Sequence, residues 1–230
     1  MEELLSTTAE ESAEEKETGR VEAFSDGVFA VAITLLIVTV KIPDPASEHL
    51  LDQMSHQGAS YLAYVTSFLT ILIMWVNHHA IFRLISRSDQ MFLLLNGLLL
   101  MDITFVNYPT ALLANFIGTN DQEAAALIYS ANGVLIAILY NALWFYASRN
   151  HRLLSKKADP ALVHTITHRY RFGPLFYLAA FVLAFVSVLA SIALNLALAL
   201  FFAFTGTSYS VQAHDRKEAK RAKRHEGVQQ

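Results

Sequence analysis

The sequence predicts an all-α membrane protein that crosses the bilayer about six times. Its 230 residues are 54% hydrophobic and 16% charged, whereas soluble domains carry about 45–50% apolar and about 25% charged residues. The charges are also segregated, because residues 1–20 hold seven glutamates and residues 214–226 hold six Lys or Arg side chains. Long apolar stretches lie between these two ends, as a protein that spans a membrane repeatedly requires.

Four apolar segments each have the length of one membrane span. A spanning helix needs about 20 mostly apolar residues, because the hydrocarbon core is about 30 Å thick and each residue rises about 1.5 Å. We expect Pro43 to end the first of these helices and Pro109 to kink the third. The four predicted spans are Val21–Ile42, Gly58–Ile85, Met91–Ile117 and Glu123–Ala147.

A fifth apolar segment, Phe172–Phe204, is too long for one span, since a single helix would measure about 50 Å. We predict two short spans here, joined by a tight turn near Ala190–Asn195. Six spans in total place both ends of the chain on the same side of the membrane.

The loop charges predict which side that is. Lys and Arg occur in loops 82–90 and 148–171 and in the C-terminal tail, while loops 44–57 and 118–122 have none. Because Lys and Arg accumulate in cytoplasmic loops, we expect both termini to be cytoplasmic in a multi-pass protein of the cell membrane.

Three regions follow from this topology. We expect residues 1–19 to form a disordered, acidic cytoplasmic tail, because they hold too little apolar surface to order themselves. Residues 20–206 are the predicted six-helix membrane domain, and residues 207–230 a basic cytoplasmic tail. We expect that tail to contact anionic lipid headgroups rather than nucleic acid, because it follows a span directly and has no interleaved aromatic residues.

Polar side chains at membrane depth are the candidate functional residues, because each costs a few kcal/mol unless it is paired or hydrated. They either form a hydrogen-bonded network that holds helices together, or serve an ion path, a proton relay or a metal site. We expect no metal and no cofactor, since adjacent His78 and His79 diverge by about 100° on a helix. The candidates are Asp26, Trp75, Asn77, His78, His79, Asn96 and Asp102.

Several sequence patterns are absent, which limits the possible functions. There is no HExxH zinc motif and no GxSxG nucleophile elbow, so we do not expect an enzyme. There is also no TVGYG-like loop for a filter of backbone carbonyls, and no span with regularly spaced arginines. An ion channel with this sequence therefore needs a filter built from helix side chains.

Two motifs carry a family resemblance. Arg20-Val-Glu-Ala-Phe24-Ser25-Asp26 matches the R-x-x-x-F-S-D signature of the transmembrane protein 175 family, and Trp75–His79 matches its W-x-N-H-H. That family comprises the lysosomal potassium channel and its prokaryotic relatives. In chains of this length, the resemblance implies a homotetrameric channel that is selective for potassium ions.

The resemblance also implies which residues line the channel and which hold its structure. The first helix of each subunit lines the pore, Arg20, Phe24, Ser25 and Asp26 form a structural signature, and the pore-facing positions are Val31, Thr34, Leu35 and Val38. Steps of three, one and three residues keep these last four on one helical stripe. Four copies would stack a hydroxyl ring between apolar rings, although helix packing also explains such a stripe.

We further predict that the signature sets the rotation of the first helix. A carboxylate at this depth needs hydrogen-bond donors. The polar cluster of Trp75, Asn77, His78 and Asn96 offers them, and we expect Ser25 and Asp26 to bond to His78 and Asn96.

The sequence therefore favours passive potassium conduction. Two alternatives remain open: a secondary transporter or proton-coupled carrier that uses Asp26, Asp102 and His78, and a membrane scaffold that transports nothing.

Overall fold

The computed structural model describes residues 2–45, 49–156 and 158–202, and the described residues contain no β-strand. Two short 3₁₀ turns, Leu36–Thr39 and Arg149–His151, follow α1 and α6. The α-helices are α1 (Glu2–Leu35), α2 (Leu50–His56), α3 (Gly58–Phe82), α4 (Gln90–Phe105), α5 (Asn107–Phe116), α6 (Gln122–Ser148), α7 (Pro160–Ala184) and a last helix, Val188–Phe202.

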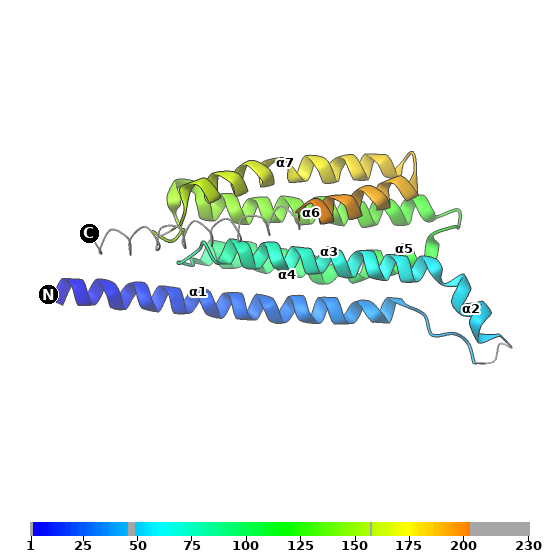
Figure 1. Cartoon of the computed structure of the whole chain (residues 1–230), viewed down its shortest axis with the longest axis horizontal. Coiled ribbons are helices and arrows are strands. Elements are labelled where there is room, and N and C mark those ends of the chain that lie inside the picture. The colour runs from blue at the N-terminus through cyan, green and yellow to red at the C-terminus, as the bar shows by residue number, and fades with distance from the viewer. Residues whose placement is uncertain (1, 46–48, 157, 203–230) are drawn as a thin grey trace, which may run out of the picture.

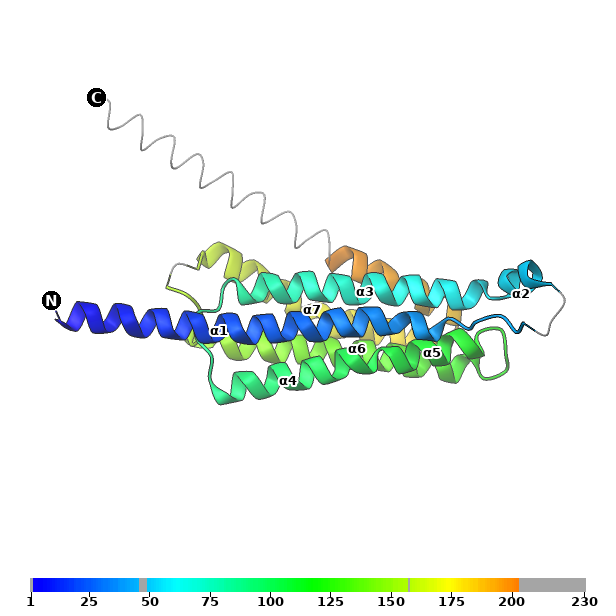
Figure 2. The same ribbon diagram turned by 90° about the horizontal axis from the view of Figure 1, so that it is seen from below.

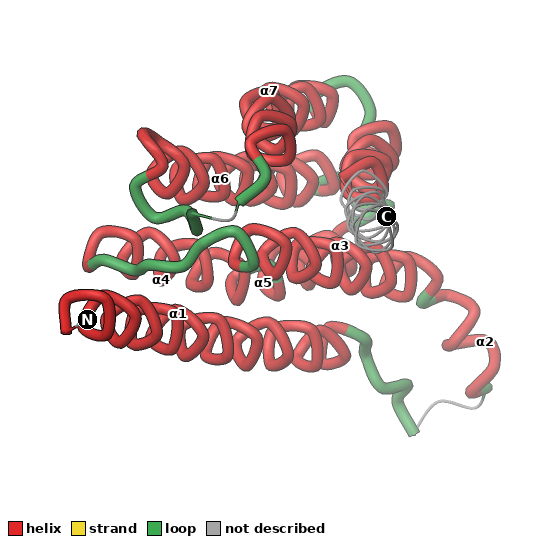
Figure 3. The backbone as a smooth tube through the Cα atoms, turned by 60° about the vertical axis from the view of Figure 1, so that its left-hand side comes forward, coloured by secondary structure: helices red, strands yellow, loops and turns green. Residues whose placement is uncertain are grey.

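The long helices lie side by side in an elongated bundle (Figure 1). α1 occupies one edge and packs against α3 and α4, while α6 and α7 lie on the far side of these helices. Figure 3 shows the same order from another direction, with α1 outermost. One side of α1 therefore packs on the bundle, and its other side faces outward.

Four helical segments are long and apolar enough to cross a membrane, as the sequence predicted. The structure therefore supports a multi-pass membrane protein. The segments are Glu17–Thr39, Ser60–Phe82, Gln90–Phe116 and Gln122–His151.

The third of these segments is broken between α4 and α5. Pro109 has no N–H to donate to the carbonyl of Phe105, so the helical hydrogen bond is lost there. The N–H of Val106 instead donates to the carbonyl of Ile103 at 3.2 Å, a tighter 3₁₀-type bond. The kink predicted at Pro109 thus lies one turn earlier, at Val106.

The fifth apolar segment does form two helices, but their boundary was predicted wrongly. The turn lies at Phe185–Ser187 and not near Ala190–Asn195, because Ser187 Oγ accepts from the N–H of Ala190 at 3.3 Å and caps the last helix. α7 also begins inside the predicted 148–171 loop. Asp159 accepts from the N–H of Ala161 at 2.9 Å, and Pro160 occupies the first helical position.

The N-terminal residues differ from the expectation as well. We expected a disordered tail over residues 1–19, whereas α1 is helical from Glu2 and extends past the ends of the other helices in Figures 1 and 2. Glutamate and alanine are strong helix formers, so this segment can be helical without a buried apolar face. The predicted basic tail, residues 207–230, lies outside the described residues.

The two basic loops meet at one end of the bundle. Ile85 and Leu154 form an antiparallel bridge, and the N–H of Ser155 donates to the carbonyl of Leu84 at 2.8 Å. Asp89 then caps α4 by accepting from the N–H of Phe92 at 2.9 Å. The N-terminal part of α1, which projects beyond the other helices, lies at the same end (Figure 1).

Candidate functional site

α1 has one fully buried face. Ser25, Phe29 and Ala32 of α1, and Leu36 at the start of the 3₁₀ turn that follows, are each 0–1% exposed, and their spacing of four, three and four residues places them on one side. This side packs against α3 and α4. The contact fixes which residues of α1 face away from the bundle.

The four residues that the sequence singled out for a pore lie on the opposite, exposed face. The side chains of Val31, Leu35 and Val38 are 55%, 52% and 77% exposed, and Thr34 is also exposed. Val38 lies in the 3₁₀ turn after α1, so the stripe continues past the end of the regular helix.

The hydroxyl of Thr34 has a defined orientation. It donates to the carbonyl of Val31 on its own helix at 2.9 Å, which uses its only hydrogen. The two lone pairs of its oxygen remain available. The stripe of each chain thus offers one hydroxyl oxygen as an acceptor between apolar side chains.

A buried hydrogen-bond chain joins α1, α4 and α3. Asn96 Nδ2 donates to Ser25 Oγ at 2.9 Å, and His78 Nε2 bonds to Asn96 Oδ1 at 2.9 Å. The amide oxygen can only accept, so His78 donates through Nε2. The imidazole of His78 also contacts the rings of Phe29 and Phe82, with centroids 5.3 Å and 4.3 Å away.

Asp26 has a different partner from the one we expected. Its Oδ1 accepts from Trp75 Nε1 at 2.8 Å, so Asp26 bonds to Trp75 rather than to His78 or Asn96. Ser25 and Asp26 are neighbours about 100° apart on the helix, so they reach different partners.

One turn earlier, Glu22 makes a contact that the sequence reasoning missed. Glu22 Oε1 lies 2.7 Å from His79 Nδ1, and the imidazole of His79 stacks on Trp75 at 6.1 Å. The signal was available, because Glu22 and Asp26 are four residues apart on α1, as are Trp75 and His79 on α3. Matched i, i+4 pairs on two helices can face each other.

The remaining predicted site residues lie elsewhere. Arg20 and Phe24 are exposed on α1, on the side of the outward stripe. Asn77 lines a cavity that α1 does not reach. Asp102 accepts from Asn132 at 2.6 Å, a contact between α4 and α6.

The charged and titratable groups at membrane depth thus have separate partners. Asp26 bonds to Trp75, His78 to Asn96, and Asp102 to Asn132. In the described part of the chain, no three His, Asp or Glu side chains come together as a metal site. This arrangement suits the joining of helices.

Comparisons with known proteins identify relatives of this chain. The sequence profile of the endosomal/lysosomal potassium channel TMEM175 family matches residues 20–106, which include the α1 stripe and its partners on α3 and α4. A potassium channel of Chamaesiphon minutus is 49% identical over 196 residues, covering 84% of this chain and 97% of that protein. A potassium channel of Streptomyces collinus is 42% identical over 190 residues, covering 82% and 92%.

A solved structure has the same fold. It is the crystal structure of a lysosomal potassium-selective channel TMEM175 homolog from Chamaesiphon minutus, with a TM-score of 0.76 and 45% sequence identity. The match covers 83% of this chain and 98% of that one.

Proposed function

Because the chain belongs to the TMEM175 potassium-channel family, we propose that it is a potassium-selective channel whose pore is lined by α1 of four subunits. Potassium ions pass down their electrochemical gradient. Passive conduction requires neither a cofactor nor a chemical step.

The observation that carries the proposal is the outward face of α1. This helix lies at the edge of the bundle, its opposite face is fully buried, and its outward stripe is Val31, Thr34, Leu35 and Val38. Four copies around a symmetry axis would bury the stripe against itself and enclose a path along the axis. The stripe of one subunit supplies only one wall of such a path, so a pore on α1 requires the assembly.

The chemistry of the stripe suits a weakly binding cation pathway. Apolar rings at Val31, Leu35 and Val38 gate by excluding water when they are narrow. At Thr34, four hydroxyl oxygens with free lone pairs can replace part of the water shell of a potassium ion. The stripe has no charged side chain, so an ion that enters is not trapped.

The hydrogen bonds on the other face of α1 set its rotation. Ser25 is joined to Asn96, and Asp26 to Trp75, so the helix cannot turn about its axis without breaking both bonds. A rotation of one residue, about 100°, would take Thr34 off the axis. The signature residues Ser25 and Asp26 thus act as positioning residues for the pore.

We also propose the membrane topology of the chain and the lipid contact of its C-terminal segment. Both termini lie in the cytoplasm of a cell whose membrane the protein spans, because the basic loops and the start of α1 lie at one end. Residues 20–206 form the channel domain, between an acidic segment of residues 1–19 and the basic segment 207–230. The latter contacts anionic headgroups.

Ion flux into liposomes tests the proposal. The purified full-length protein is reconstituted, and potassium uptake is followed under a potassium gradient alone. Sustained uptake supports a channel. Uptake that requires a pH gradient supports a carrier that uses Asp26, Asp102 and His78, and no uptake supports a scaffold; either result contradicts the proposal.

A further inference from the structure

A second feature of the molecule is a cavity of about 50 Å³ inside the subunit. Its walls come from α3, α6, α7 and the last helix, Val188–Phe202, and α1 contributes none of its lining. The cavity is therefore separate from the outward stripe of α1.

The cavity contains polar groups without partners. Asn77 and the hydroxyls of Tyr170 and Tyr177 line it, and none of these side-chain groups makes a hydrogen bond within the part of the chain that the structure describes. Asn141 also lines the cavity, and its Nδ2 donates to the carbonyl of Ala137 at 2.9 Å, which leaves its oxygen as an acceptor. Such groups at membrane depth are destabilising unless something bonds to them.

Pro174 interrupts the backbone hydrogen bonding of α7 next to residues that line the cavity. Pro174 lies inside α7 and has no N–H, so the carbonyl of Tyr170 lacks its usual helical donor. Gly173, which lines the cavity, carries no side chain that would fill this space. The same turn thus leaves an open volume and removes the usual helical donor of the Tyr170 carbonyl.

The rest of the lining is apolar and uncharged. Ile73, Met74, Ile136 and Phe202 are among the wall residues, and among the described residues that line the cavity there is no Asp, Glu, Lys, Arg or His. The ring of Phe202 stacks on Tyr177, with centroids 6.4 Å apart. A charged ligand would find no counter-charge here, whereas an apolar body would find aromatic and aliphatic walls.

From these observations we propose that the cavity binds an uncharged amphiphile, with one or two hydroxyl or carbonyl oxygens and an apolar body. The oxygens bond to Asn77, Tyr170 and Tyr177, and the body packs on Phe202 and the aliphatic wall. Asn77, Asn141, Tyr170 and Tyr177 are half-buried, so the cavity opens at the surface of the bundle. The ligand is either a neutral membrane lipid such as diacylglycerol or a small free phenol or alcohol, since both carry this chemistry.

Photolabelling of the full-length protein in liposomes tests this proposal. The probe is a phenol that carries a diazirine, and mass spectrometry maps its adducts. We expect saturable labelling of α3 and α7 peptides that contain Asn77, Tyr170 or Tyr177. Competition by unlabelled phenol but not diacylglycerol identifies a small free ligand as the occupant, and competition by diacylglycerol identifies a lipid.

Two variants sharpen the result. Ala137→Phe fills the cavity from α6, and we expect labelling to fall about tenfold, equivalent to about 1.4 kcal/mol. The matched control, Ala131→Phe, adds the same ring to the exposed face of α6 and should label normally. Tyr177→Phe removes only a hydroxyl and should weaken labelling while the protein remains folded.

Labelling that does not saturate, that spreads over outward-facing residues, or that both Ala137→Phe and Tyr177→Phe leave unchanged would overturn the proposal. The potassium flux assay is a separate measurement. If the protein conducts potassium but is not labelled as expected, only the cavity proposal is contradicted. If the protein is labelled as expected but does not conduct potassium, only the channel proposal is contradicted.

Discussion

The amide of Asn96 on α4 donates a 2.9 Å hydrogen bond to the hydroxyl oxygen of Ser25 on α1, and both side chains are buried. The hydroxyl of Ser25 in turn donates to the carbonyl of Val21 at 2.9 Å. Asn96 uses its oxygen to accept from His78. Ser25 is therefore the point at which α3 and α4 together hold α1, on the face opposite the proposed pore stripe.

Replacing Ser25 tests whether this chain positions α1. Ser25→Ala leaves the Asn96 amide without its acceptor, which should lower the free energy of unfolding by about 1–3 kcal/mol. We expect a lower thermal midpoint in detergent and reduced potassium uptake into liposomes. Ser55→Ala is the control, because Ser55 is exposed on α2 and its hydroxyl donates to the backbone carbonyl of Asp52 in the same helix. Wild-type uptake by Ser25→Ala would contradict a positioning role.

Thr34→Ala tests the hydroxyl ring. Loss of four oxygens from the proposed pore should reduce potassium-over-sodium selectivity by about tenfold, equivalent to about 1.4 kcal/mol of differential interaction. Thr104→Ala is a closely matched control, because Thr104 is also exposed and donates to the carbonyl three residues earlier, at 2.8 Å against 2.9 Å. Selectivity is measured from reversal potentials in planar bilayers. An unchanged ratio in Thr34→Ala would show that the filter lies elsewhere.

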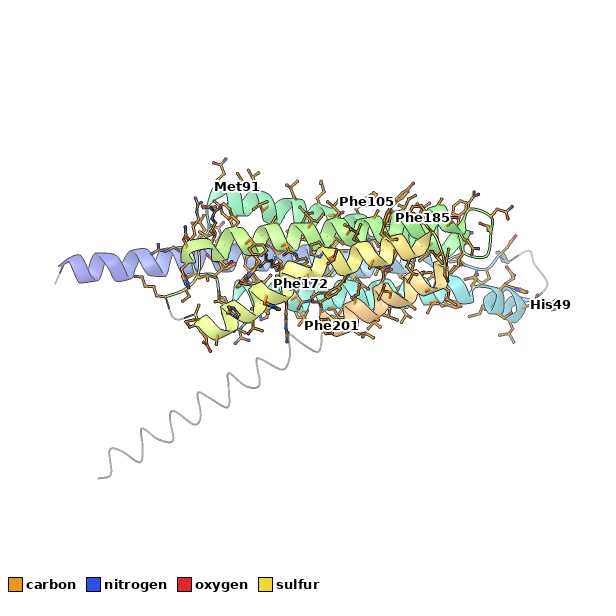
Figure 4. The ribbon with its side chains drawn as sticks, turned by 90° about the horizontal axis from the view of Figure 1, so that it is seen from above. His49, Met91, Phe105, Phe172, Phe185 and Phe201 are labelled. Carbon is orange, nitrogen blue, oxygen red and sulfur yellow. The ribbon has the colours of Figure 1, made fainter. Side chains whose placement is uncertain are left out.

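Leu35→Asn tests gating by the apolar rings. A polar side chain in a narrow apolar constriction keeps it wet, so we expect a higher potassium flux and a larger fraction of time open. Leu98→Asn on α4 places the same change at an exposed position away from the α1 stripe and should not raise the flux. Two other residues of α4, Met91 and Phe105, lie along the outer edge of α4 in Figure 4. If both variants raise the flux equally, the effect comes from the membrane and not from a pore.

A carboxylate outside the membrane-spanning segments should make stability depend on pH. Partial burial raises the pKa of Asp89, but hydrogen bonds from Phe92 and Tyr146 and the charge of Arg152 outweigh it, so the pKa lies below its ordinary value of 3.8. Stabilisation by Asp89 is therefore present above the unfolded pKa and is lost as pH falls through the lower folded value. The Tyr146 hydroxyl donates at 2.7 Å, and Arg152 Nε lies 3.4 Å away.

Asp89→Asn should therefore lower the thermal midpoint at pH 7, and its difference from the wild type should shrink toward pH 3. The measurement is a melting curve in detergent at both pH values. Asp121→Asn, an exposed position before α6, is the control and should change little. A difference that stays constant with pH would mean that charge on Asp89 does not stabilise the fold.

The proposed pore also predicts an assembly. Native mass spectrometry of the protein in mild detergent should give a mass four times that of the 25.6 kDa chain. Because the stripe of α1 encloses a path only when several copies meet, a stable monomer that still conducts potassium would contradict a pore on α1.

The spans were predictable because they depend on local properties. Apolar length identified the four long segments, and a resemblance carried by a few residues identified the family. Where one apolar run contains a turn, the composition is uniform, so the boundary at Phe185–Ser187 was placed several residues too late. Only the capping serine marks that turn, and it is a weak signal within an apolar segment.

The sequence by itself determined that Val31, Thr34, Leu35 and Val38 share one stripe, because helical spacing alone sets which residues are on one side. Only the tertiary structure decided that this stripe faces outward, and that Asp26 bonds to Trp75 while Ser25 bonds to Asn96. The reason is physical. The spacing fixes angles within a helix, whereas partners across helices depend on the rotation and depth of each helix, which packing of the whole bundle sets.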